Sequence, residues 1–340
     1  MTRPTMAACD PHLPRVTCPA CLEEAGVLLG SGASATPPHK CEACGLVFAH
    51  PMPDTATLMA FYQGFSFQRQ SRAELLRHLP AIRRSLTHFV GPPVGTGRFL
   101  DYGGATGVYA RAAQDLGWKA AVSDFDIAML RIAHDELGVP HTFVEPECID
   151  GEPYDVIFSF HVIEHWNDID SNISRLLKLL SPGGRLLFAT PNAQTTEKRV
   201  RHRQRRGYIR ILESHGVNHT EAERLLAKDD SITCWDPPRH LFAFTPASLR
   251  ALGARFGFVT RVMTGYNTST LFEPRQYSIP TLLSLSRRAI EGVARGSRST
   301  LLAALRDIPS TARHRLGLAW LELRFPDLGE QLYVEFKKPT

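Results

Sequence analysis

The sequence lacks any long apolar run of the kind that crosses a membrane. No stretch of about 18 consecutive apolar residues occurs in the 340-residue chain. The N-terminal residues also lack a charged segment followed by an apolar one, so no secretory signal peptide is expected. Charge of one sign is not in large excess, since the net charge is +5 and 21% of the residues are charged. These absences predict a cytoplasmic globular protein, and the modest positive charge alone does not indicate a nucleic-acid partner.

Cysteine is also sparse, with seven residues in the chain, an odd number. Four of them form two C-x-x-C pairs, Cys18 with Cys21 and Cys41 with Cys44. Zinc prefers thiolate ligands in tetrahedral geometry, and two such pairs at this separation match the pattern of a zinc ribbon. We therefore predict that these four cysteines hold a structural Zn²⁺ in a reducing compartment, rather than forming disulfides. Free thiols are the alternative interpretation.

A glycine-rich turn between two short apolar runs is the most informative feature of the chain. The first run ends in Asp101, and the turn that follows reads GGATG, from Gly103 to Gly107. A helical segment and a second apolar run come next, and this run closes on Asp124. In an open parallel sheet, ligands bind at the carboxyl ends of the strands, and an acid after the second strand accepts hydrogen bonds from a ribose. The pattern predicts an adenosine-containing cofactor. A dinucleotide fingerprint would need a glycine at Val108, so an NAD-linked oxidoreductase is a less favoured interpretation.

Three further stretches follow in an ordered series. They read GEPYDVIFSFHVIEH at 151–165, SPGGRLLFATPN at 181–192 and PRHLFAFTP at 238–246. Together with the glycine turn, they resemble the class I S-adenosylmethionine-dependent methyltransferases, and above all the branch of methyltransferase domain 23. The resemblance implies a Rossmann-like, doubly wound α/β sheet that is mostly parallel, with an antiparallel last strand. It implies S-adenosylmethionine as the cofactor. The middle glycine of the family's turn is Ala105 here, which adds a methyl group beside the expected cofactor.

The resemblance also implies which residues bind the cofactor. Its methionine and ribose end would contact the residues of the turn, which are Asp101, Gly103, Gly104, Ala105 and Gly107. Asp124 would bind the ribose hydroxyls, and Phe125 would pack on the adenine. Glu145 or Glu147 would reach the adenine amino group.

The candidate catalytic residues lie just after the apolar run 154–160. His161, Glu164 and His165 are spaced i, i+3 and i+4, so they would share one face of a helix, and His240 comes from the PRHLFAFTP stretch. Three interpretations stay open. His165 or His161 is a general base, a task that suits the histidine pKa of about 6.5. Alternatively, the four residues hold a divalent ion that activates a hydroxyl, as the resemblance to some relatives implies. Otherwise Glu164 and His165 only orient the loop, and catalysis relies on proximity.

The chain divides into three predicted parts: a zinc-ribbon module at 1–53, a helical cap or linker at 54–95 and a methyltransferase domain at 96–340. Helical spacing of apolar residues supports the second part. The third alternates strands with helices, which predicts a sheet covered on both faces. Its expected strands are 98–102, 119–123, 142–144, 154–160, 185–190, 258–266 and 331–336.

Two insertions interrupt the predicted methyltransferase domain, at about 193–234 and 267–328. The first carries the basic run Lys198–Arg210, which suits phosphate contact, although such a run is more often a solvated face. The second mixes leucines with arginines in the pattern of amphipathic helices. It would form a substrate lid, a dimer contact or a peripheral membrane contact.

These observations predict a methyltransferase that acts by in-line transfer on a small molecule, such as a sugar nucleotide, a glycan intermediate or a secondary metabolite. The alternative from another class is a nucleic-acid-binding protein or an RNA methyltransferase, which would use the zinc ribbon and the segment 198–210. The sequence does not specify the acceptor atom, the pathway or the oligomeric state.

Overall fold

The computed structural model describes residues 15–29, 36–64, 71–144, 149, 153–194, 209–210, 213, 218–220, 222–223, 234, 237–265 and 331–339. Two predicted features lie almost wholly outside them: the basic run, of which only 209–210 are described, and the insertion 267–328. Within the described residues, no helix has the length and apolar character needed to cross a membrane.

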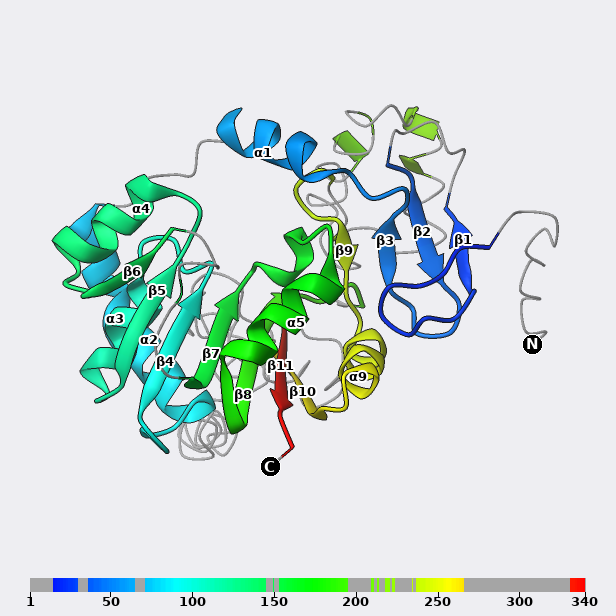
Figure 1. The fold of residues 1–340 in the computed structure, drawn as a ribbon. Coiled ribbons are helices and arrows are strands. Elements are labelled where there is room, and N and C mark those ends of the chain that lie inside the picture. Colours follow the sequence, from blue (N-terminus) through cyan, green and yellow to red (C-terminus); the bar gives the residue numbers. More distant parts are fainter. Residues whose placement is uncertain are drawn as a thin grey trace, which may run out of the picture.

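Seven strands form the main sheet in the order β10-β11-β8-β7-β4-β5-β6 (Figure 1). Their bounds are β4 Arg98–Tyr102, β5 Lys119–Ser123, β6 His141–Phe143, β7 Tyr154–Phe160, β8 Leu180–Pro191, β10 Val259–Gly265 and β11 Gln331–Lys337. Strands β8, β7, β4, β5 and β6 run parallel to one another, whereas β11 is antiparallel to both β8 and β10. The predicted doubly wound sheet with an antiparallel last strand is therefore confirmed.

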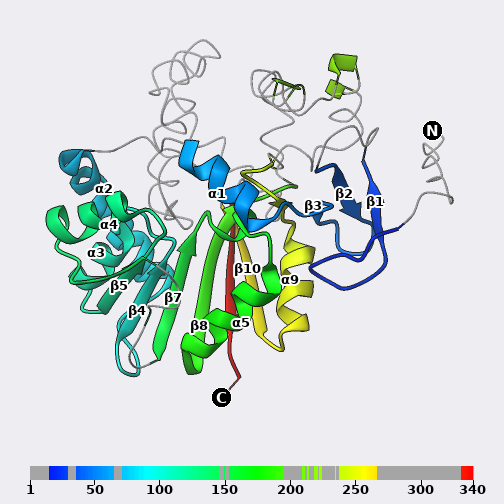
Figure 2. The same cartoon turned by 45° about the horizontal axis from the view of Figure 1, so that its top comes forward.

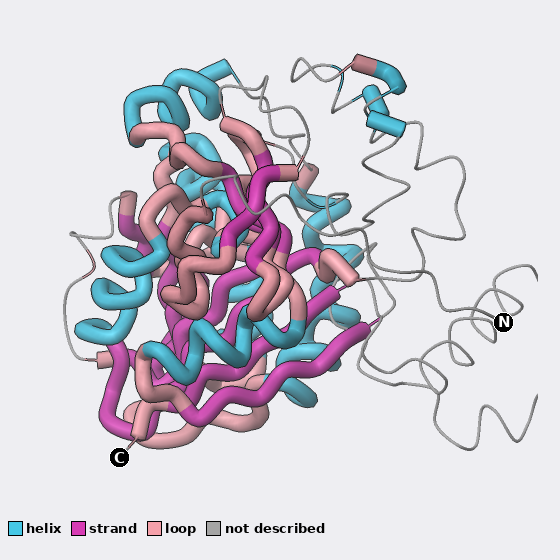
Figure 3. Tube along the Cα trace, turned by 90° about the vertical axis from the view of Figure 1, so that its right-hand side faces the viewer, coloured by secondary structure: helices cyan, strands magenta, loops and turns pink. Residues whose placement is uncertain are grey.

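The central strands are buried because helices cover both faces of the sheet (Figures 1 and 3). Six of the seven residues of β7 are buried, as expected for a parallel strand with helices on either side. One core contains side chains of α2 (Arg72–Phe89), α3 (Val108–Asp115) and α4 (Ile127–Arg131). The other contains side chains of α5 (Ile169–Leu179) and α9 (Pro246–Arg255). A π-helical turn, η1 (Ile132–Glu136), extends α4 in the first core.

The predicted helical segment 54–89 forms two helices, α1 (Thr55–Gly64) and α2. A capping box begins α2, because Ser71 accepts from the backbone N–H of Glu74 and the Glu74 carboxylate accepts from the N–H of Ser71. This reciprocal pairing satisfies two N–H groups that the helix end would otherwise leave without partners. Apolar residues at helical spacing form the buried face of α2, including Leu75, Leu79 and Leu86.

A second, four-stranded antiparallel sheet has the order β1-β2-β3-β9. Its strands are β1 Gly26–Leu28, β2 Pro38–Cys41, β3 Val47–Ala49 and β9 Phe242–Ala243. The first three belong to the predicted ribbon and lie next to α9, beyond one edge of the main sheet (Figure 2). The fourth comes from the predicted methyltransferase domain, so the boundary drawn at residue 53 does not enclose the whole ribbon sheet. The three-part division itself stays a prediction.

Gly107 shows why the turn before α3 needs glycine. It is the residue before the helix and has a φ of +68°, a conformation that costs an L-residue about 1–2 kcal/mol. A Cβ there would also lie 2.8 Å from the Cβ of Ala133. Gly138 has nearly the same φ, +69°, but a Cβ there would meet nothing closer than Arg111 Nη1 at 3.8 Å.

We expect Gly107→Ala to lower the free energy of unfolding by about 2–4 kcal/mol, since crowding adds to the backbone cost. Gly138→Ala, the matched control, should lose only the backbone part, about 1–2 kcal/mol. Urea unfolding of both variants measures the difference. Equal losses would show that the contact with Ala133 does not constrain the turn.

Candidate functional site

A cavity of about 690 Å³ opens at the carboxyl ends of β4, β5 and β7. Helix α1 contributes Thr55, Leu58, Met59 and Tyr62 to its lining. The ends of the strands and the loops after them supply the other side, including Gly103, Ala105, Asp124, Phe125 and His161. Ligands of open α/β sheets bind at this edge.

The glycine turn folds back toward β5 through its backbone. The N–H groups of Gly103 and Gly104 donate to the carbonyl of Ser123 at 2.8 and 3.1 Å. The next residue, Ala105, has a φ of +45°, which is the conformation that the family's glycine would adopt at little cost. Its N–H donates to Asp124 Oδ2 at 2.8 Å. The structure therefore keeps the turn despite the substitution, with a hydrogen bond to a carboxylate at the strained residue.

Asp124 lies at the end of β5 and lines the cavity. Its Oδ1 accepts from the N–H of Asp126 at 2.9 Å, and burial raises its pKa above the ordinary value. An ionised carboxylate offers about four lone-pair sites, so two backbone hydrogen bonds leave it able to accept from a diol. The predicted position of Asp124 beside a ribose is compatible with this geometry.

Asp101 lies in a different place, below the turn rather than in the cavity. Its carboxyl is fully buried, and its Oδ2 accepts from the N–H of Ala110 at 3.2 Å, whereas Oδ1 has no hydrogen-bond partner among the described residues. Burial raises its pKa to about 8, although the bond from Ala110 acts in the opposite direction. Gly104 and Gly107 also lie outside the cavity lining. A Cβ on Gly104 would come within 2.3 Å of the Asp101 carboxyl carbon, so Asp101 lies against the turn and leaves no room for a side chain at Gly104.

The opposite end of the cavity is apolar. Phe125, Met129 and Val144 line it, and the Phe125 ring lies 5.5 Å from the ring of Tyr62, between centroids. Phe125 is 49% exposed. Glu145 and Glu147 lie outside the described residues.

The predicted catalytic residues converge where β7 ends, but not on an α-helix. The segment after β7 forms a single 3₁₀ turn, η3 (Ile163–His165), and His161 before it has a φ of +56°. Glu164 is fully buried at this turn. Its Oε1 pairs with His161 Nδ1 at 3.0 Å, and its Oε2 accepts from Thr190 Oγ1 at 3.0 Å. Burial alone would raise its pKa, but the hydrogen bond and the nearby histidines lower it to about 2.

His165 and His240 lie side by side, with ring centroids 4.9 Å apart. His165 Nδ1 is 2.7 Å from the carbonyl oxygen of Arg239 and 2.9 Å from the hydroxyl of Tyr62. A carbonyl only accepts, so Nδ1 carries the hydrogen and Nε2 keeps a lone pair. His240 Nδ1 lies 3.1 Å from the carbonyl of Cys234, which selects the same tautomer. Burial lowers the pKa of His165, so the ring is neutral at pH 7.

The structure thus brings three of the four predicted residues into one group. Glu164, His165 and His240 place potential ligand atoms within 4.8 Å of one another. His161 is not in that group, because its Nδ1 pairs with Glu164 from another side. Sequence reasoning did not include Tyr62 or Thr190 in the catalytic group. A hydroxyl after the apolar run 186–189 was a usable signal for Thr190, whereas the contact of Tyr62 depends on how α1 lies over the sheet.

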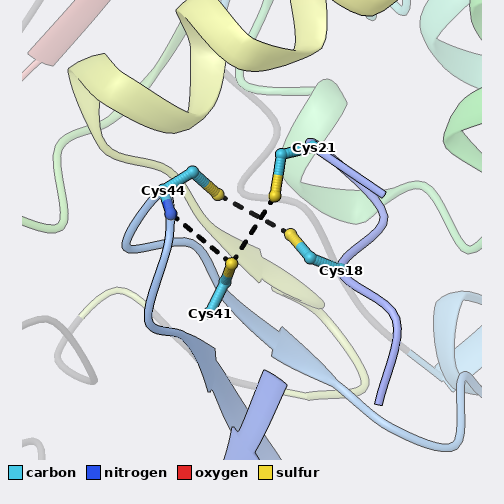
Figure 4. A group of neighbouring side chains, drawn as sticks. All are labelled: Cys18, Cys21, Cys41 and Cys44. Atoms are coloured by element: carbon cyan, nitrogen blue, oxygen red, sulfur yellow. Dashed lines mark hydrogen bonds between the residues drawn. The ribbon is translucent and has the colours of Figure 1, made fainter. Parts of the chain in front are cut away.

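The four N-terminal cysteines form a compact cluster (Figure 4). Cys18 Sγ lies 3.6 Å from Cys44 Sγ, and Cys21 Sγ lies 3.6 Å from Cys41 Sγ. Four thiolates at about 2.3 Å from one tetrahedral zinc lie about 3.8 Å apart. The measured separations fit this value and exclude disulfide bonds in these pairs, which would need about 2.05 Å.

Comparison with known proteins identifies the family. The family described as Methyltransferase domain (Methyltransf_23) matches residues 67–261. The chain belongs to this family. It therefore carries a class I S-adenosylmethionine-dependent methyltransferase domain, and the cavity lies at the carboxyl ends of the strands in the sheet of this domain.

Two curated relatives are similar to parts of this chain. Malonyl-[acyl-carrier protein] O-methyltransferase of Alcanivorax borkumensis is 32% identical over 140 residues, which are 36% of this chain and 47% of that protein. Ubiquinone biosynthesis O-methyltransferase of Brucella ovis is 28% identical over 102 residues, 28% of this chain and 41% of that protein. The chain thus spans less than half the length of these relatives.

Two solved structures are similar to this chain at low sequence identity. The plantazolicin methyltransferase BpumL in complex with S-adenosylhomocysteine has a TM-score of 0.40 at 14% identity, covering 85% of this chain and 92% of that one. Phosphoethanolamine N-methyltransferase 2 of Haemonchus contortus has a TM-score of 0.44 at 17% identity, covering 86% and 63%.

The buried carboxyl of Asp101 predicts a pH-dependent stability. Its pKa is about 8 in the folded state and about 3.9 in the unfolded chain. The folded state therefore holds a proton that the unfolded state releases, and the stability from this group falls as pH rises from about 4 to 8. We expect Asp101→Asn to gain stability relative to the wild type between pH 6 and pH 8.5, measured by urea unfolding. The exposed Asp135→Asn should follow the wild-type profile, and an Asp101→Asn profile parallel to it would contradict the assignment.

Proposed function

We propose that this chain transfers the methyl group of S-adenosylmethionine to an oxygen atom of a small molecule bound in the cavity. The observation that supports this most directly is the arrangement of Asp124, the glycine turn and His165 around one cavity. Family membership supplies the reaction class, and the cavity residues suggest how it is carried out.

The residues present fit the cofactor. Asp124 has acceptor capacity for the ribose hydroxyls, and Phe125, Met129 and Val144 offer apolar surface for the adenine. Gly103 lies toward β7, where the methionine end would reach. When bound, the cofactor supplies a methyl group already activated by the sulfonium. The protein therefore has to orient the acceptor, exclude water and remove a proton.

His165 is the residue that we assign as the general base. Its Nδ1–H is fixed by the carbonyl of Arg239, so Nε2 is the atom that takes the proton from the acceptor hydroxyl. Its lowered pKa keeps the ring neutral at pH 7. The Glu164 carboxylate beside it favours the imidazolium that forms.

A divalent ion on Glu164, His165 and His240 is the second candidate for activating the acceptor. Their ligand atoms lie within 4.8 Å of one another, and both histidines face backbone carbonyls through Nδ1, as metal-bound histidines commonly do. Against it, each Glu164 oxygen already has a hydrogen-bond partner. We therefore favour the base.

We also propose that Cys18, Cys21, Cys41 and Cys44 hold a structural Zn²⁺. Their spacing fits one tetrahedral ion. All four ligands are thiolates, so the site leaves no open position for chemistry, and its contribution is to the fold.

Two observations favour a small acceptor with a reactive oxygen. Both curated relatives described above are named as O-methyltransferases, and a cavity of about 690 Å³ has to hold the cofactor as well as the reacting part of the acceptor. A sugar nucleotide, a glycan intermediate and a secondary metabolite all meet this requirement. The nucleic-acid alternative depends on a basic run that lies almost wholly outside the described residues.

The proposal is tested by incubating the purified protein with S-adenosylmethionine and separate panels of phenols, carboxylic acids, sugar nucleotides and RNA. Formation of S-adenosylhomocysteine is followed in each. Turnover with a small oxygen acceptor supports the proposal, whereas turnover with RNA alone overturns it in favour of the RNA methyltransferase.

We expect Asp124→Asn to weaken binding of S-adenosylhomocysteine by about 10- to 100-fold, because hydrogen bonds to a charged group are lost. Asp126→Asn is the matched control. It also lines the cavity, but asparagine keeps its hydrogen bonds to the start of α4, so affinity should stay within about threefold. Calorimetric titration measures both, and equal affinities for the two variants would remove Asp124 from the cofactor site.

For His165→Gln we expect kcat to fall by about 10²- to 10⁴-fold, the usual contribution of a general base. The affinity for S-adenosylhomocysteine should change by less than about threefold, because Asp124 and the turn are intact. His240→Gln distinguishes the two mechanisms. A similar loss in this variant, together with activity that follows added Mg²⁺ or Mn²⁺ after chelation, would contradict the base and favour the ion.

A further inference from the structure

The two-residue strand β9 belongs to two parts of the protein at once. It pairs with β3 of the ribbon, with Val47 opposite Ala243 and Phe48 opposite Phe242. Just before β9, the carbonyl of Leu241 accepts from the N–H of Ala49 at 2.9 Å. Strand β3 follows directly on the second cysteine pair, so the ribbon backbone continues into the β9 contact.

The residues after β9 contact both cysteine pairs. Thr245 Oγ1 donates to the carbonyl of Cys44 at 2.9 Å, and both residues are buried. Arg255, at the end of α9, donates to the carbonyl of Pro19, which lies between the first two cysteines. In Figure 4 the pale yellow strand and helix of this segment pass beside the cysteine cluster.

The residues before β9 contact the catalytic turn. The N–H of Leu241 donates to the carbonyl of Glu164 at 2.8 Å. The His240 ring lies against the His165 ring, and the carbonyl of Arg239 accepts a hydrogen bond from Nδ1–H of His165. Only a few residues of backbone thus separate the contact with the ribbon from the contact with the proposed base.

The cofactor half of the site is built differently. The helices that follow the turn, α3 and α4, pack in the other core, which contains Tyr109 and Met129. The strands β4 and β5 contribute to both cores, and the ribbon cysteines share theirs with Ile163, Trp166 and Leu241. The segment before β9 is hydrogen-bonded to the Glu164 carbonyl, whereas the Asp124 carboxylate accepts from Ala105 and Asp126. We therefore expect a disturbance of the ribbon to affect the catalytic turn more than Asp124.

We propose that the zinc ribbon is a positioning element for the catalytic histidine pair: through β3, β9 and Thr245, it holds Arg239 and His240 against His165. The inference rests on the proposed function, because it takes zinc on the four cysteines and His165 as the base. Thr245 is a positioning residue in this arrangement, since it touches the ribbon and not the reacting atoms.

The test compares three variants of the full chain with zinc bound. Thr245→Val removes the donor to Cys44, and Thr245→Ser keeps it. Ser248→Ala is the matched control, because Ser248 completes the cap of α9 with Thr245 but makes no hydrogen bond to the described residues of the ribbon. Amide hydrogen exchange is measured over residues 238–244, together with kcat and the affinity for S-adenosylhomocysteine. The zinc-stripped wild type is measured by exchange and affinity.

In Thr245→Val we expect exchange over residues 238–244 to rise about tenfold, the effect of losing one buried hydrogen bond. We expect kcat to fall, while the affinity for S-adenosylhomocysteine stays within about threefold. Thr245→Ser should behave as the wild type, and Ser248→Ala should leave exchange and kcat near the wild-type values. Zinc removal should raise exchange in the same segment, again with little effect on affinity.

Several outcomes would overturn the inference. Equal exchange in Thr245→Val and Ser248→Ala would assign the effect to the cap of α9. Unchanged exchange after zinc removal would separate the metal from β9, and a parallel loss of S-adenosylhomocysteine affinity would indicate general unfolding. A protein that binds no zinc at all would instead contradict the proposed structural metal. The Thr245 variants would then still decide whether the ribbon backbone holds β9.

Discussion

The burial of the Glu164 carboxylate is the constraint on which the site depends. A carboxylate removed from water is costly unless it is paired and hydrogen-bonded. Here the partners come from three places: His161 at the end of β7, Thr190 near the end of β8, and the histidine pair around it. Two neighbouring strand ends and the segment 239–241 therefore have to converge on one point. The positive φ of His161 is part of this convergence, because it brings the ring back toward Glu164.

The ribbon packs against the segment that supplies residues 239–241, so it is not a separate module. Its strands are short, and three of its cysteines are buried among residues of the larger core. A unit of this size buries too little apolar surface to fold independently, and such units usually depend on a metal or on a neighbour. Here the neighbour is the segment that carries β9 and the start of α9. Packing that stabilises the ribbon therefore also fixes the residues beside the Glu164 carbonyl.

The sequence predicted the strands of the main sheet well because apolar runs bounded by turn residues are local signals. The observed β6 differs from the expected strand by one residue, and β8 begins five residues earlier than expected. Asp101 and Asp124 show what local sequence patterns do not predict. Asp101 lies within β4 and is buried below the turn, whereas Asp124 follows the last residue of β5 and lines the cavity. Two aspartates that close similar apolar runs thus lie in different places, because β4 includes Asp101 whereas β5 ends before Asp124.

The pairing of β9 could not be predicted for a related reason. Two residues carry almost no periodicity, and their partner in β3 lies far away in the sequence. The predicted catalytic helix was also absent. The i, i+3 and i+4 spacing pointed to His161, Glu164 and His165, but a single 3₁₀ turn and the returning segment 239–241 bring Glu164, His165 and His240 together and leave His161 outside that group. The spacing could not predict this geometry, because it depends on contacts distant in sequence.

Ala105 is a strained residue in the turn that we propose binds the cofactor. A non-glycine residue in the left-handed region costs about 1–2 kcal/mol, and such strain persists only where the surroundings determine the conformation. At Ala105 the surroundings are the Asp124 carboxylate, which accepts from its N–H, and the Ser123 carbonyl, which holds the two glycines before it. The end of β5 therefore supplies the hydrogen-bond partners that determine the conformation of this turn.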